Sequence, residues 1–67
     1  MPAIELQLRL RNLHAERLLA WLEGLTADVV YMADLEDEIA EVSAAYTGAA
    51  VTEIATLRAE LSGPQAG

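Results

Sequence analysis

The 67-residue chain has no cysteine, no lysine and no phenylalanine, and it contains a single histidine, His14. Without cysteine no disulfide can stabilise it, and a zinc site is disfavoured because such sites are built from thiolates and several imidazoles. A domain this small buries only about 60% of the surface that its unfolded chain exposes. Small domains therefore often need a disulfide, a metal or association, and here association is the device that remains.

Positive charge is also scarce. Eleven acidic residues against 4 arginines give a formal net charge of −7. This charge disfavours binding to nucleic acid or to an anionic membrane, since both need a positive field. The longest run without a charged residue, 42–52, is far shorter than the ~20 residues that span a bilayer. The start of the chain lacks the pattern of a signal peptide, so we expect no membrane span and a cytoplasmic location.

Apolar side chains are plentiful, because they make up 54% of the residues. Much of this content is alanine and leucine, which favour helices. The bulkier apolar residues exceed what one small core would hide, and the surplus indicates burial against another protein chain, either a second copy or an assembly partner. The lysine-free, alanine-rich composition is typical of a GC-rich coding source, such as an actinobacterium or its phage.

Residues 4–11 alternate strictly between apolar and polar side chains, which is typical of a half-buried β-strand. The propensities of Leu, Glu, Gln and Arg instead favour a helix. We predict a strand, and because no second alternating run exists, its edge would pair with a second copy or with a partner's sheet. A helix here would remove that edge. The edge residues are Ile4, Leu6, Leu8 and Leu10.

Downstream, the apolar spacing predicts helices over residues 13–23 and about 27–46. Asn12 can cap the first helix, Gly24 can end it, and Thr26 or Asp28 can cap the second. The second helix has apolar residues in steps of 3, 4, 3 and 4, the heptad spacing that packs against another helix. This seam consists of Met32, Leu35, Ile39, Val42 and Tyr46.

Gly48 interrupts this pattern, which resumes one residue out of phase at Ala50, Ile54, Leu57 and Leu61. Either a turn lies at Gly48, which we favour, or one long helix carries a phase shift. The predicted fold is mainly α: a short N-terminal strand and two or three helices (β-α-α-α) in one domain over 1–61, completed by oligomerisation, with a flexible tail at 62–67. The expected core is Leu6, Leu8, Leu18, Leu22, Leu35, Ile39, Val42, Ile54 and Leu57.

Five carboxylates crowd the second predicted helix, at Asp34, Glu36, Asp37, Glu38 and Glu41. We interpret them first as a solvated face opposite the seam. The alternative is a docking surface for a basic partner, including mimicry of nucleic acid charge. Calcium binding receives least weight, because the glycine and alternating oxygen ligands of a calcium loop are missing.

Arg9, Arg11 and Arg17 make the start of the chain weakly basic. This asymmetry could orient two copies or a partner, and we take Arg9 and Arg11 as possible basic contacts. Trp21 is either a core residue or an interface anchor. No spacing indicates a catalytic group: His14 stands alone, and no serine has an activating base. We therefore predict no enzyme activity, no cofactor and no metal.

The order of elements resembles the ribbon-helix-helix family over residues 4 to about 42. The resemblance is carried by a strand with outward Gln7, Arg9 and Arg11, then a helix, then Gly24-Leu25-Thr26 and a second helix. It implies a dimer whose paired strands read the DNA major groove, which the net negative charge opposes. The favoured hypothesis is a non-enzymatic interaction or structural subunit. The alternatives are this DNA-binding regulator and an acidic inhibitor that occupies a basic nucleic-acid-binding site.

Overall fold

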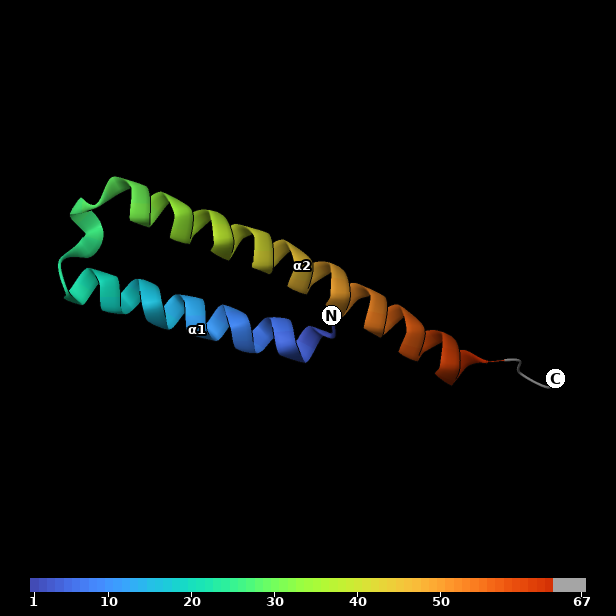
Figure 1. The fold of residues 1–67 in the computed structure, drawn as a ribbon. Helices are drawn as coiled ribbons and strands as arrows, with labels where there is room; N and C mark the ends of the chain where they lie inside the picture. Colours follow the sequence, from blue (N-terminus) through green and yellow to red (C-terminus); the bar gives the residue numbers. More distant parts are fainter. Residues whose placement is uncertain (64–67) are drawn as a thin grey trace.

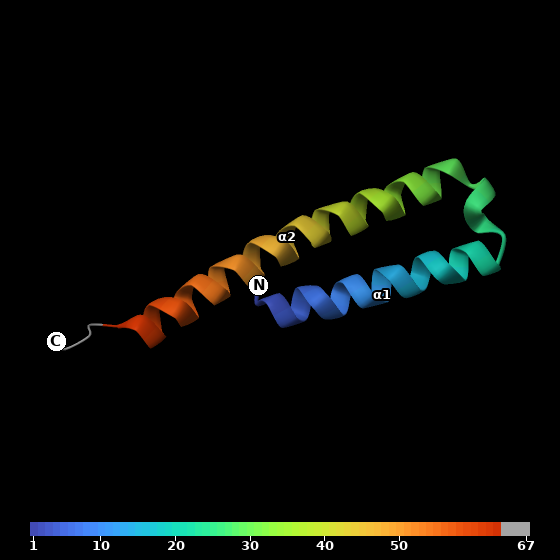
Figure 2. The same cartoon turned by 180° about the vertical axis from the view of Figure 1, so that it is seen from behind.

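The computed structural model describes residues 1–63, and within them it contains two α-helices and no strand. Helix α1 spans Ala3–Leu22 and α2 spans Val29–Ser62, with the short 3₁₀ turn η1 at Leu25–Ala27 between them. The two helices lie antiparallel as a hairpin (Figures 1 and 2), and the N-terminus lies beside the middle of α2. The result is a rod of 63 × 16 × 13 Å. The fold is helical as expected, but the β-α-α-α arrangement is wrong.

The predicted strand at 4–11 is the beginning of α1. Its helix-favouring residues prevail because a lone strand would leave its backbone unpaired, whereas a helix satisfies its own hydrogen bonds. The alternation is compatible with a helix because Leu6, Leu10 and Leu13 also fall at helical spacing and pack toward α2. Ile4 and Leu8, which should have formed the same strand edge, are exposed instead. The strand edge therefore does not exist.

The ends of the helices near the turn follow the predicted signals. Gly24 adopts a left-handed φ of 78°, and the Glu23 and Gly24 N–H groups donate to the Leu19 and Trp21 carbonyls. Asp28 caps α2, because its Oδ1 accepts from the Tyr31 N–H at 3.0 Å. The other end is different: α1 begins after Pro2, so Asn12 is an interior residue of the helix and not its cap.

Helix α2 runs without interruption through Gly48, so the favoured turn at that position is wrong. A glycine in a helix costs about 1 kcal/mol relative to alanine, which is too little to break a helix that continues well on both sides. The phase shift of the apolar pattern therefore lies inside one continuous helix. Its apolar side chains change direction around the helix axis after Gly48.

The core is a single line of contact between the two helices. The α2 seam meets residues of α1 that are spaced by 3 and 4 positions, and five large side chains become buried: Leu6, Leu13, Leu35, Ile39 and Val42. Other expected core residues are exposed: Leu8, Leu18, Leu22, Ile54 and Leu57. The first three lie off the α2-facing side of α1, and the last two lie beyond the N-terminus of α1. A hairpin of two helices has only one interior face, so it cannot cover them.

Candidate interaction surfaces

The predicted seam is covered by the chain's own first helix. Leu35, Ile39 and Val42 are buried against α1, while Met32 and Tyr46 are half-buried at the margins. The seam packs against another helix, as its spacing indicates, and that helix is α1 of the same molecule. It is therefore occupied within the hairpin.

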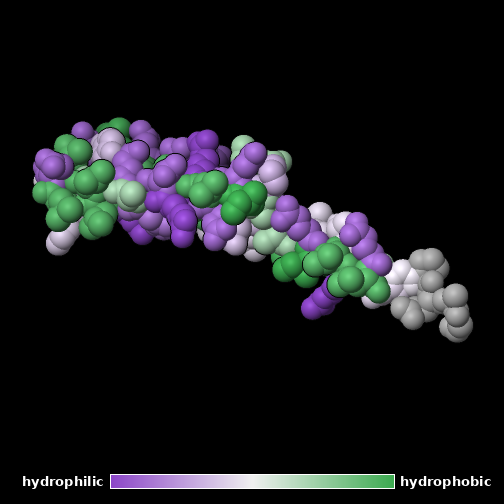
Figure 3. Space-filling model, turned by 90° about the horizontal axis from the view of Figure 1, so that it is seen from below, coloured by the Kyte–Doolittle hydropathy of each residue, from purple (hydrophilic) through white to green (hydrophobic). Residues whose placement is uncertain are grey.

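A second apolar surface lies where α2 extends past α1. We define the overhang as residues 50–62, the orange and red end of α2 in Figure 1. Near its base the Ala3 N–H donates to Glu53 Oε1 at 3.2 Å, which marks the point where α1 begins. Beyond this point a single helix remains, and Figure 3 shows hydrophobic side chains gathered on it. The exposed apolar residues of the overhang are Val51, Ile54, Leu57 and Leu61, with exposures of 62%, 52%, 54% and 74%.

The overhang's apolar stripe does not continue the α1-facing line. That line, extended past Tyr46 and Ala49 by the same spacing, falls on the polar residues Glu53, Thr56 and Glu60. The apolar residues come one position later. One position is a rotation of about 100° around a helix, so the stripe points sideways from the plane of the hairpin. A helix that covered it would have to lie beside α2 and not in line with α1.

The acidic face and the arginines meet across the hairpin. Arg9 Nη2 donates to Glu38 Oε1 at 2.6 Å, and Arg17 Nη1 lies 3.3 Å from both Glu36 carboxylate oxygens. These side chains are about half exposed, and pairs of this kind contribute roughly 0–1 kcal/mol each. Two carboxylates of the face thus join α2 to α1, while Asp34, Asp37 and Glu41 are exposed, as is Arg11.

Arg17 also contacts His14, with 3.0 Å between Nη2 and Nδ1. A guanidinium can only donate, so Nδ1 is the acceptor in this contact. His14, Arg17 and Glu36 therefore form one chain of contacts across the two helices. Sequence reasoning missed this link, although His14 and Arg17 stand three residues apart, a spacing that brings side chains together on a helix.

Tyr31 forms a further link. Its hydroxyl donates to Glu16 Oε2 at 2.8 Å. This hydrogen bond, followed by partial burial and by the negative charge of Glu16, raises the pKa of the Tyr31 hydroxyl above its ordinary value of 10.0. All three effects favour the protonated phenol, because the carboxylate can only accept the hydrogen bond and it repels a phenolate.

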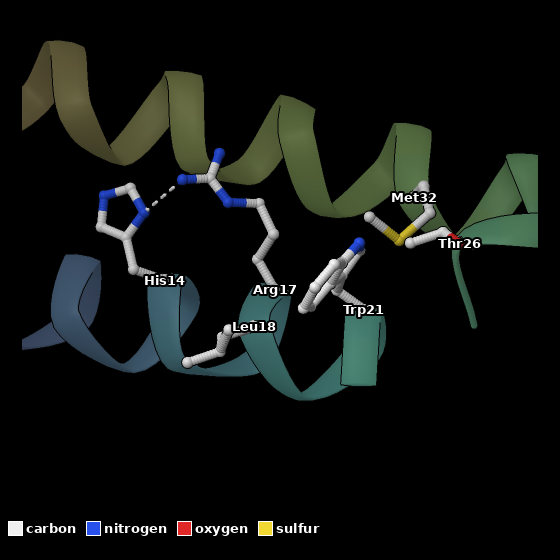
Figure 4. Close-up of a pocket in the computed structure, with 6 residues that line it drawn as sticks. All are labelled: His14, Arg17, Leu18, Trp21, Thr26 and Met32. Carbon is white, nitrogen blue, oxygen red and sulfur yellow. Dashed lines mark hydrogen bonds between the residues drawn. The ribbon is translucent and has the colours of Figure 1, made fainter. Parts of the chain in front are cut away.

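A surface depression of about 440 Å³ lies near the turn, lined by His14, Arg17, Leu18, Trp21, Thr26 and Met32. Figure 4 shows the Trp21 indole close to the Met32 side chain, with Arg17 reaching across toward α2. The charged group in it, Arg17, is already engaged by Glu36 and His14, and Trp21 is 66% exposed. The depression offers an apolar contact surface, but it brings no set of polar groups together around a small ligand.

Residues 1–63 contain no group of three or more His, Cys, Asp or Glu side chains that could hold a metal ion. Within the same residues, neither helix has the length and apolar character needed to cross a membrane. Comparison with known protein families, with curated proteins and with solved structures finds no match.

Proposed function

We propose that this chain is a small, non-enzymatic structural or interaction subunit that self-associates or docks into a larger assembly through helix packing. The observation that carries the proposal is the balance between covered and uncovered apolar side chains. Five large apolar residues form the buried core, whereas fourteen of the described large hydrophobic residues are exposed. Exposed apolar surface of this kind often marks a site of contact with another protein, so this excess of exposed apolar side chains favours a protein partner.

The location of these residues supports packing between helices. They lie mainly on the two long helices, on sides that the hairpin contact does not use. Stable helical proteins bury each apolar helix stripe against another element. Covering these exposed apolar side chains with helices of another chain would complete a small bundle. Full burial of a leucine or isoleucine side chain contributes about 1.5–3 kcal/mol.

The two alternative functions have less support. The ribbon-helix-helix hypothesis depended on an N-terminal strand, and residues 4–11 are helical. The acidic-inhibitor hypothesis needs a free array of carboxylates, but Glu36 and Glu38 already face Arg17 and Arg9 of the same chain. No observation on the described residues favours either alternative over association.

The proposal is tested by the mass of the chain in solution. Light scattering over a concentration series of roughly 1–500 µM, combined with far-ultraviolet circular dichroism, should give a helical species of at least twice the 7.2 kDa chain mass. A chain that is unfolded alone and becomes helical only with a partner would also support the proposal. A helical, cooperatively unfolding monomer at every concentration would contradict it.

A further inference from the structure

The overhang carries the spacing of a two-stranded coiled coil. Its apolar residues step by 4, 3 and 4, which places Ile54 and Leu61 at heptad position a and Ala50 and Leu57 at position d. One heptad of the overhang has β-branched Ile54 at a and Leu57 at d, the combination that in parallel coiled coils favours two strands. We propose that the overhang binds the overhang of a second copy, side by side and parallel. This inference rests on the proposed function and names its partner.

The charges that flank the stripe are complementary in this arrangement. Glu53 falls at position g and Arg58 at position e. In a parallel pair these positions meet across the seam, so Glu53 of each chain faces Arg58 of the other, and twofold symmetry makes the contact twice. An antiparallel pair would instead bring g positions together, setting Glu53 and Glu60 against acidic residues of the second copy. Charge thus selects the parallel orientation.

Glu53 is available for this contact. Its Oε1 accepts from the Ala3 N–H, and a carboxylate has a second oxygen with acceptor capacity for a guanidinium. Arg58 is exposed on the same helix. The bond to Ala3 holds the Glu53 side chain near the N-terminus of α1, which limits the conformations that it would lose on pairing.

The same heptad positions, a and d, continue toward the start of α2 and would add contact area to the proposed interface. They carry the small exposed residues Ala33, Ala40, Ser43 and Thr47, with Val29 at the start. Small side chains let two helices approach closely. Glu36 is the one charged residue in this line, and Arg17 already engages it. Contact along the whole of α2 would extend about 51 Å, which suits the roughly 1,200–2,000 Å² of a stable interface better than two heptads alone.

Leu57 is the central residue for a test. Leu57→Asp should raise the dimer dissociation constant at least ~100-fold, because it places a charge in the middle of the seam. Leu57 is 54% exposed and lies beyond the start of α1, so the helical signal of the hairpin should persist. The matched control is Leu19→Asp, at a 58% exposed position of α1, which should leave the dissociation constant within about twofold.

Sedimentation equilibrium on these variants separates the inference from the proposed function. If the unmodified chain is a dimer and Leu57→Asp dissociates it, the inference is supported. If the Leu57→Asp variant remains a dimer with unchanged affinity, the overhang is not the interface, although association itself still holds. If the unmodified chain is a folded monomer, both the overhang pairing and the proposed function are contradicted.

Charge reversal gives a second measurement that does not depend on the apolar seam. Arg58→Glu should raise the dissociation constant about tenfold, because two Glu–Arg contacts become Glu–Glu contacts. Adding Glu53→Arg should restore most of the affinity. Glu53→Arg alone controls for loss of the contact to Ala3. A double variant no tighter than Arg58→Glu would contradict the parallel pairing.

Orientation is tested by a cysteine at position 50. The natural chain has no cysteine, so Ala50→Cys introduces the only thiol. In the parallel pair the two Cβ atoms at this d position face each other, and mild oxidation should give a disulfide-linked dimer on a non-reducing gel. Ala59→Cys, at the outward position f, should cross-link much more slowly. Equal rates at the two positions would overturn the parallel arrangement.

Discussion

Leu35 is the large side chain that the hairpin covers best, with 3% exposure. Leu35→Ala should lower the free energy of unfolding by about 2–5 kcal/mol, because it leaves a cavity between the helices. Ile39→Val is the graded variant and should cost about 0.5–1.5 kcal/mol. Urea unfolding followed by circular dichroism measures both. Leu19→Ala, at a 58% exposed position, should differ from the unmodified chain by less than about 0.5 kcal/mol. Equal losses at Leu35 and Leu19 would refute the described core.

Tyr31 should make part of the stability depend on alkaline pH. Its folded-state pKa is raised, chiefly by the hydrogen bond to Glu16. A raised pKa stabilises the fold fully below the unfolded value near 10, and this contribution disappears as the pH rises through the folded value. The thermal midpoint of the unmodified chain should therefore exceed that of Tyr31→Phe at pH 8, and the difference should narrow above pH 10.

The titration of Tyr31 can be observed directly. In a Tyr46→Phe variant, Tyr31 is the only remaining tyrosine, and phenolate absorbance near 295 nm should give a midpoint above 10. Replacing Glu16 with alanine should move that midpoint down toward 10. A midpoint that does not respond to Glu16→Ala would show that the hydrogen bond is not formed in solution.

Core residues could be predicted from the sequence only where the spacing of apolar residues within one helix determines their burial. Leu35, Ile39 and Val42 stand at the spacing of a helix seam, and this spacing is visible in a single segment of sequence. Ile54 and Leu57 have the same spacing but are exposed. Whether they are covered depends on where α1 begins relative to α2, which is a property of the assembled hairpin.

Gly24 lies in the turn between the two helices and Gly48 lies inside α2, and the two positions should respond oppositely to alanine. Gly48 lies inside α2, and a Cβ there meets no atom within 4 Å. Gly48→Ala should therefore raise the stability by about 1 kcal/mol. Gly24 adopts φ 78°, so Gly24→Ala should lower the stability by about 1 kcal/mol. Thermal unfolding by circular dichroism tests both variants. A destabilising Gly48→Ala would indicate a break in α2.

At the scale of the element, the turn between the helices is easier to predict than the identity of the first segment, on which the predicted cap Asn12 also depended. Asp28 and Gly24 act through their own backbone neighbours, so the turn between the helices was visible locally. The segment 4–11 satisfies the patterns of both strand and helix, and only packing against α2 decides between them. The apolar pattern does shift by one position after Gly48, and because α2 is continuous there, the shift creates a second apolar direction on one helix.

The molecule as a whole is a rod with one thick end and one thin end, and the proposed pairing makes a specific prediction about its shape. Two copies with parallel α2 helices lie side by side, so the longest dimension of the dimer should stay close to the 63 Å of one chain. Antiparallel pairing restricted to the overhangs would place the hairpins at opposite ends and lengthen the particle to about 100 Å. Small-angle X-ray scattering at dimer concentrations distinguishes these dimensions. A longest dimension near 100 Å would rule out the side-by-side arrangement. A thicker rod of unchanged length is the expected result, because the charged positions Glu53 and Arg58 of the overhang are complementary only when both C-termini point the same way.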